Sequence, residues 1–216
     1  MYSKHPRKLV RSLADIEAIE QECDLHSRYD SRSTYDLLKH SAVRSPDHPA
    51  LIFEPGSTGP LGSRVISYAE LLKAVTGTAN FLYELGVRQH DVVSFILPNL
   101  VETHFINLGA QAAGISNPIN PLLNAEHTAE ILRAANTRIL FAYRSDAALW
   151  EKAVELKSRV SSIERLVEVG PPSGDVENFD ELLSRSSQDR LTSERDINEA
   201  DIAAYYHTGG STGAPK

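Results

Sequence analysis

The chain has 216 residues, of which 41% are hydrophobic and 24% are charged. This composition excludes collagen-like, low-complexity and wholly disordered chains, and it predicts a folded unit of one large domain or two small ones. The 22 basic residues against 29 acidic ones give a net charge of −7, which argues against a nucleic-acid-binding surface and a polybasic membrane anchor.

The elements can be predicted in chain order from hydrophobic spacing and turn residues. Residues 1–32 are polar and weakly helical, and we interpret them as a peripheral segment. The sequence then predicts a helix over 33–45, strands over 50–53 and 64–67 joined by the turn-rich residues 54–62, and a helix over 68–85. It next predicts a strand over 92–97, a helix from 99 towards 114, an extended segment over 115–119 and a helix over 125–135. The last predicted elements are a strand over 138–142, a helix over 146–160, a strand over 165–169, a helical turn near 179–183 and a strand over 202–206.

Capping signals mark several helix ends. Ser67 and Glu70 have the spacing of a capping box, and Gly86 provides the left-handed residue that ends the same helix. Candidate N-caps of the other helices are Ser33, Asn99 (with Glu102 three residues later), Asn124 and Ser145-Asp146.

From residue 92 onward, apolar strands alternate with helices. This rhythm predicts an α/β fold with a parallel sheet covered by helices on both faces, preceded by an early β-hairpin. Ligands of such sheets bind beyond the carboxyl ends of the strands. The loop after the last predicted strand is therefore the place to look for a site.

That loop is rich in glycine, hydroxyl groups and a final lysine: its residues are His207, Thr208, Gly209, Gly210, Ser211, Thr212, Gly213, Ala214, Pro215 and Lys216. Glycines let backbone amides turn towards an anion, while hydroxyls and a lysine add donors and positive charge. The loop predicts a polyphosphate site, with a plain surface turn as the alternative. Walker A, dinucleotide and Gly-x-Ser-x-Gly patterns do not fit its spacing.

The order of residues in this loop resembles the phosphate-binding motif of the adenylate-forming superfamily, which includes acyl-CoA synthetases, peptide-synthetase adenylation domains and luciferases. The family pattern is an aromatic or similar residue followed by Thr-Ser-Gly-Ser/Thr-Thr-Gly-x-Pro-Lys, after an Asp-x-Ala strand. Asp201, Ile202 and Ala203 match that lead-in, and Gly209 replaces the usual serine but keeps the backbone amide.

Upstream segments also resemble the family, over nearly the whole chain after Ser33. Asn117 to Leu123 is closer to the acyl-CoA synthetase branch than to the peptide-synthetase branch. The family's later motifs are absent from these residues. The resemblance therefore implies residues 1–32 as a peripheral segment and residues 33–216 as a partial AMP-binding domain, the N-terminal portion of a longer enzyme and inactive by itself.

The implied reaction is the ATP-dependent activation of a small-molecule carboxylic acid (fatty, aromatic or short-chain) as an acyl-adenylate, followed by transfer to coenzyme A, with Mg²⁺ accompanying ATP. Thr208, Gly209, Gly210, Ser211, Thr212, Gly213 and Lys216 would bind the phosphates, with no catalytic or metal-ligating residue assigned. Two alternatives remain: an adenylation enzyme that loads a carrier protein, and a non-catalytic nucleotide-binding module. His207 either lines the pocket or is a hydrogen-bonded structural residue.

The single cysteine, Cys23, lies among acidic residues, which disfavour a thiolate, so it is not expected to be catalytic. One cysteine and no secretory or membrane-spanning segment predict a cytoplasmic protein, and the resemblance suggests a role in fatty acid metabolism. The sequence leaves the carboxylic acid unidentified and homo-oligomerisation open.

Overall fold

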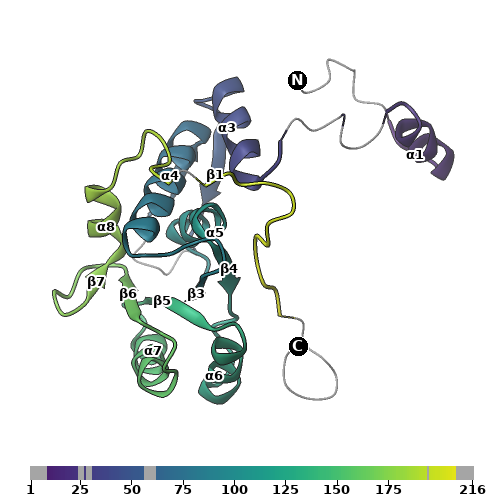
Figure 1. Ribbon diagram of the computed structural model, residues 1–216. Helices are drawn as coiled ribbons and strands as arrows, with labels where there is room; N and C mark the ends of the chain where they lie inside the picture. Colours follow the sequence, from purple (N-terminus) through teal and green to yellow (C-terminus); the bar gives the residue numbers. More distant parts are fainter. Residues whose placement is uncertain (1–8, 24–26, 28–30, 56–61, 194, 208–216) are drawn as a thin grey trace.

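The computed structural model describes residues 9–23, 27, 31–55, 62–193 and 195–207. Its strands are β1 (Pro49–Phe53), β2 (Arg64–Ser67), β3 (Val92–Ile96), β4 (Ile115–Pro118), β5 (Thr137–Tyr143), β6 (Arg165–Val169) and β7 (Glu177–Asn178). Its helices are α1 (Leu13–Glu20), α3 (Thr34–Arg44), α4 (Tyr68–Glu84), α5 (Val101–Ala113), α6 (Ala125–Ala134), α7 (Ala147–Arg159) and α8 (Phe179–Arg185). Figure 1 shows helices on both faces of the main sheet, so the α/β class predicted from the sequence is confirmed.

The main sheet is parallel and has the strand order β4-β3-β5-β6-β7. The chain enters the sheet at β3 and then forms its neighbour β4 at one edge. Helix α6 then connects β4 to β5, which pairs with the other side of β3. β1 and β2 form a separate antiparallel hairpin, as expected, and residues 56–61 of its loop lie outside the described ranges.

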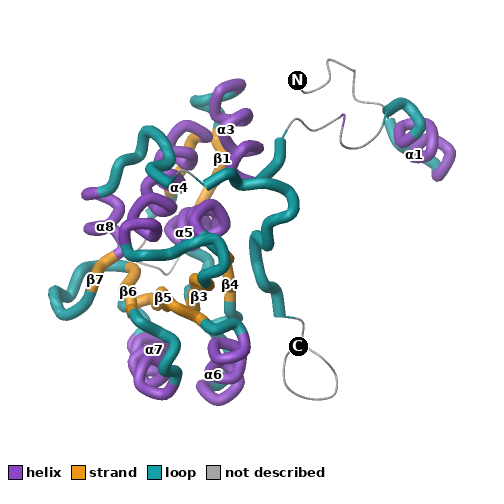
Figure 2. Tube along the Cα trace, viewed as in Figure 1, coloured by secondary structure: helices purple, strands orange, loops and turns teal. Residues whose placement is uncertain are grey.

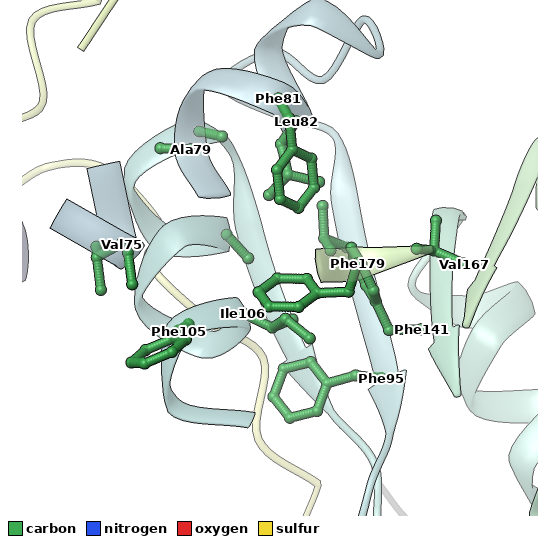
Figure 3. Packing of buried hydrophobic residues seen from close by; sticks show 14 of the residues in the cluster. Val75, Ala79, Phe81, Leu82, Phe95, Phe105, Ile106, Phe141, Val167 and Phe179 are labelled. Atoms are coloured by element: carbon green, nitrogen blue, oxygen red, sulfur yellow. The ribbon is translucent and has the colours of Figure 1, made fainter. Parts of the chain in front are cut away.

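Each face of the sheet has its own core. Helices α4, α5 and α8 lie on one face, and α6 and α7 on the other (Figures 1 and 2). On the first face Phe81, Phe141 and Phe179 form a fully buried aromatic group with ring centroids 5.7–6.3 Å apart (Figure 3). Edge-to-face geometry adds to the burial of such rings, so this group joins α4, β5 and α8 into one core.

Two glycines are required in this layer, Gly109 by close packing and Gly86 by its backbone conformation. A Cβ at Gly109 of α5 would lie 2.5 Å from the Thr78 Cγ2 atom of α4, so the helices approach each other only because that carbon is absent. Gly86 follows α4 with φ +93°, the left-handed conformation predicted for the end of this helix.

Most predicted caps are confirmed. Ser33, Ser67, Asn124 and Asp146 each accept a hydrogen bond from a backbone amide in the first turn of a helix, and Glu70 completes the capping box with Ser67. The expected cap at Asn99 is wrong. Helix α5 begins after Leu100, whose N–H donates to the Thr103 hydroxyl, while Glu102 pairs with Arg64 of β2.

Helix α1 lies apart from the rest of the fold, and none of its residues is buried (Figure 2). Its Ser12–Asp15 capping box is the feature that holds its first turn. Across the described part of the chain, no helix combines the length and the apolar character needed to cross a membrane.

A long irregular segment after α8 carries the chain from the β7 edge back to the β4 edge (Figure 1). Asn80 of α4 anchors it: the Asn80 side-chain amide donates to the carbonyls of Ser187 and Arg190, and its oxygen accepts from Thr192. Asn80 is buried and bonded through both its amide nitrogen and its oxygen, so the segment is held across this face of the fold.

Candidate functional site

Residues 203–205 lie beside β4 and extend the sheet at that edge (Figure 2). The Ser116 N–H donates to the Ala203 carbonyl (3.0 Å), and the Tyr205 N–H donates to the Ser116 carbonyl (2.9 Å). The pairing is parallel, so this segment points the same way as β4. Of the strand predicted over 202–206, the described residues form a single parallel bridge, between Ala204 and Ser116. It nevertheless brings His207 to the carboxyl end of the sheet, where ligands of parallel sheets bind.

Asp201 holds this segment just upstream of the pairing. Its carboxylate accepts from the Gln89 amide (2.5 Å), the Arg195 guanidinium (2.9 Å) and the Asn198 N–H (3.2 Å). Burial raises the pKa of Asp201, but these donors outweigh it and hold the pKa below its ordinary value of 3.8. The carboxylate is thus charged at neutral pH and fixes the start of the segment.

A hydrogen-bond relay continues from His207 into the sheet. His207 Nε2 lies 2.7 Å from Asn117 Oδ1, the Asn117 amide donates to Ser94 Oγ (2.7 Å), and Ser94 Oγ lies 2.7 Å from Thr137 Oγ1. These four residues belong to the 203–207 segment, β4, β3 and β5. We call them the relay. Ser94, Asn117 and Thr137 have 0% exposure and His207 is half-buried, so the relay is a polar path that runs from the surface into the sheet.

The direction of the relay determines the protonation of His207. Because the Asn117 nitrogen donates to Ser94, its oxygen faces His207, and Nε2 must carry the hydrogen of that bond. Burial lowers the pKa of His207 below its ordinary value of 6.5. At neutral pH His207 is therefore an uncharged imidazole, and among the described residues its Nδ1 has no hydrogen-bond partner.

The phosphate-loop residues predicted from the sequence follow directly: Thr208, Gly209, Gly210, Ser211, Thr212, Gly213 and Lys216. All of them lie outside the described residues, so their assignment stays a prediction. Sequence reasoning missed Ser94 and the side chain of Asn117 as site residues. The available signal was a serine inside the apolar run 92–97 and an asparagine just before Pro118.

We also searched the described residues for metal-binding groups and nucleophiles. They contain no group of three or more His, Cys, Asp or Glu residues that could hold a metal ion. Cys23 is exposed and far in sequence from the relay. We therefore assign no metal ligand or nucleophile among the described residues.

A hollow of about 490 Å³ lies elsewhere, between the end of α4 and the segment around residue 195. Arg88 stacks over the Tyr83 ring beside it, 4.0 Å from the ring centroid. Its lining residues Gln89 and Ala113 precede β3 and β4, so the hollow lies at the amino end of these strands, opposite His207. It is therefore separate from the candidate site.

Residues 38–216 match the family described as AMP-binding enzyme. The chain is 32% identical over 209 residues to marinolic acid–CoA ligase of Pseudoalteromonas sp., a match that covers 96% of this chain and 32% of that protein. It is 27% identical over 212 residues to 4-coumarate–CoA ligase 3 of Arabidopsis thaliana, covering 98% of this chain and 34% of that protein. The chain thus spans about a third of the length of these curated relatives.

Solved structures share the fold. An anthranilate CoA ligase in complex with anthranoyl-AMP superposes with a TM-score of 0.73 at 21% identity, over 88% of this chain and 35% of that one. A long-chain-fatty-acid–CoA ligase from Archaeoglobus fulgidus gives 0.73 at 23% identity, over 87% of this chain and 36% of that one. At these identities the likeness shows the arrangement of the sheet and helices.

Proposed function

The chain belongs to the AMP-binding enzyme family, and on that premise we propose that it is the N-terminal portion of an ATP-dependent ligase that activates a carboxylic acid as an acyl-adenylate and transfers it to coenzyme A. One observation carries the proposal. The glycine-rich loop with a final lysine begins directly after His207, which the structure places at the carboxyl end of a parallel sheet. In a chain of this family, that position is suited to hold the phosphates of ATP.

The first step needs positioning and neutralisation of charge more than a nucleophile of the protein. A carboxylate oxygen of the substrate attacks the α-phosphorus of ATP, the bond to the β-phosphate oxygen breaks, and pyrophosphate leaves with its electron pair. Backbone amides at Gly210 and Gly213, the hydroxyls of Thr208, Ser211 and Thr212, and the Lys216 ammonium would hold the β- and γ-phosphates. Lys216 provides the positive charge of this set.

Mg²⁺ would accompany ATP and bind to its phosphates. It would neutralise the charge that develops on the leaving pyrophosphate. Because the described residues hold no cluster of metal-ligating side chains, we assign it no protein ligand among them.

In the second step a thiol sulfur attacks the acyl carbon, and AMP leaves. The names of the relatives, marinolic acid–CoA ligase and 4-coumarate–CoA ligase, support coenzyme A as the thiol. Those names give two different acids, so the proposal states the substrate class only as a small-molecule carboxylic acid. We also propose that the enzyme acts in fatty acid metabolism and in the cytoplasm.

The test is exchange of labelled pyrophosphate into ATP by the full-length protein, with a panel of fatty, short-chain and aromatic acids. We expect exchange that depends on one class of acid, and a loss of about a hundredfold in Lys216→Ala. Lys39→Ala, which removes an exposed lysine of α3, is the matched control and should keep the exchange rate. ATP binding without carboxylate-dependent exchange would contradict the proposal in favour of a nucleotide-binding module.

The acceptor is tested separately, by release of AMP from the preformed adenylate. We expect coenzyme A to trigger this release. Release with a phosphopantetheine-bearing carrier protein and not with coenzyme A would replace the proposed acceptor by a carrier protein.

A further inference from the structure

The proposed reaction assigns no role to the side chains of the relay, which end on His207. Polar side chains buried in a sheet cost free energy unless each finds a partner, and a shape-matched apolar path through β3, β4 and β5 would avoid that cost. Ser94, Asn117 and Thr137 are nevertheless fully buried and bonded in series, and the series ends on His207. The half-buried imidazole is the member that reaches the surface of the sheet.

The relay adds a third tether to the 203–207 segment. Two backbone hydrogen bonds to Ser116 hold Ala203 and Tyr205. The bond from His207 to Asn117 lies two residues further along, so the segment is fixed up to the last residue before position 208. A chain fixed at residue 207 has a defined starting point for the residues that follow it.

The hydrogen on Nε2 makes this tether independent of charge. Asn117 Oδ1 accepts from Nε2, and within the described residues Nδ1 of His207 forms no hydrogen bond. Its bond to Asn117 therefore needs only one donor N–H at that place. A glutamine side chain offers an N–H donor at nearly the same distance from the backbone as Nε2 of histidine.

We propose that His207 is a positioning residue of the nucleotide site: through Asn117 it fixes the point at which the chain leaves the sheet for residues 208–216, and it acts as a neutral imidazole with its proton on Nε2. This inference rests on the proposed function, because it takes the loop after His207 to be the phosphate loop. The role is positional, so it depends on the bond to Asn117 and not on a positive charge at position 207. Burial, which lowers the pKa of His207, agrees with a neutral ring.

The test is a double-mutant cycle on ATP affinity in the full-length protein. His207→Ala and Asn117→Ala should each weaken ATP binding about tenfold, which corresponds to one lost hydrogen bond. The double variant should be no weaker than the single ones, because both remove the same bond. His207→Gln should stay within about threefold of the wild type. Additive losses, unchanged affinity in His207→Ala, or a Gln variant as weak as the Ala variant would overturn the proposal.

The matched control is Asn178→Ala. Asn178 is also a buried, hydrogen-bonded asparagine at an edge strand of the same sheet, but at the β7 edge. It should lower the free energy of unfolding and keep the ATP affinity. An ATP affinity that falls as much in this variant as in Asn117→Ala would show that the effect is a general loss of structure, and would overturn the inference.

A spectroscopic measurement tests the tautomer without any enzyme assay. The ¹⁵N shifts of the His207 ring should show a protonated Nε2 and an unprotonated Nδ1 at neutral pH, and the reverse assignment would overturn the inference. Failure of the proposed function is distinguishable: a wild type that binds ATP without carboxylate-dependent exchange sinks that function alone, while the cycle still tests His207. A wild type that binds no ATP overturns both.

Discussion

The two edges of the parallel sheet end in similar residues that are used differently. At the β7 edge, the buried Asn178 donates to the Gly170 carbonyl and the Glu168 carboxylate, and its oxygen accepts from the first amides of α8. Glu168, at 0% exposure, also accepts from the N–H (2.7 Å) and the hydroxyl (2.8 Å) of Ser173, and Arg144 lies 3.7 Å away. Every partner in this network belongs to the fold itself. We call it the closed edge.

At the β4 edge, Asn117 occupies the corresponding place, and its network ends on His207. One ring nitrogen of His207 forms no bond within the described residues, and the predicted phosphate loop starts at the next residue. We call this the open edge. The two edges differ in how their networks end: the closed edge finds all its partners within the fold, whereas the open edge ends on a ring nitrogen without a described partner, which makes it a candidate for ligand positioning.

The largest expected effect is at the closed edge. Glu168→Ala removes the acceptor of the Ser173 donors, one of the two acceptors of the Asn178 amide and the carboxylate beside Arg144, and should lower the free energy of unfolding by about 3 kcal/mol. Urea unfolding measures the loss. The ATP affinity at the opposite edge should not change, and a parallel fall in affinity would break the distinction between the two edges.

The next effect concerns the upstream clamp of the open edge and depends on pH. Asp201→Asn removes the charge that Arg195 and Gln89 stabilise, and should cost about 1–2 kcal/mol of stability at pH 7. The folded pKa of Asp201 lies below 3.8, so its contribution is complete above 3.8 and is lost as pH falls through the folded value. Urea unfolding from pH 7 to pH 3 should show a difference between the two proteins that is constant at the higher pH values and begins to shrink below about 3.8. A difference that shrinks already between pH 7 and pH 5 would contradict the assignment.

The smallest expected effect on stability comes from a single hydroxyl at the closed edge. Ser173→Ala removes one hydroxyl donor from Glu168 and should cost about 1 kcal/mol, with ATP binding preserved. Thermal unfolding and ATP titration of the same sample measure both quantities. A change in ATP affinity without a change in stability would reverse the roles of the two edges.

Local signals made much of the fold predictable from the sequence. Ser67 and Glu70 form a capping box within one turn, and Gly86 ends the same helix through its own backbone conformation. The expectation at Asn99 is wrong because the helix begins after Leu100, whose N–H donates to the Thr103 hydroxyl. Glu102 pairs instead with Arg64, which lies 38 residues away in the sequence. The two-residue strand β7 was missed because its pairing with β6 depends on register and has no local pattern.

The candidate site was predictable in one part and not in the other. The loop 207–216 carries its chemistry in consecutive residues, so composition and order were enough to suggest phosphate binding. The relay joins residues 43 and 90 positions apart, and it exists only because the sheet places β3 between β4 and β5. The same geometry places His207, whose two interpretations the sequence left open, on a hydrogen bond to Asn117.

The most direct test of the difference between the edges is calorimetric ATP titration of the full-length His207→Ala and Ser173→Ala variants, side by side with the wild type. We expect the affinity to fall about tenfold for His207→Ala and to stay at the wild-type value for Ser173→Ala. Equal affinities in all three proteins, or a loss confined to Ser173→Ala, would contradict the assignment of nucleotide positioning to the open edge.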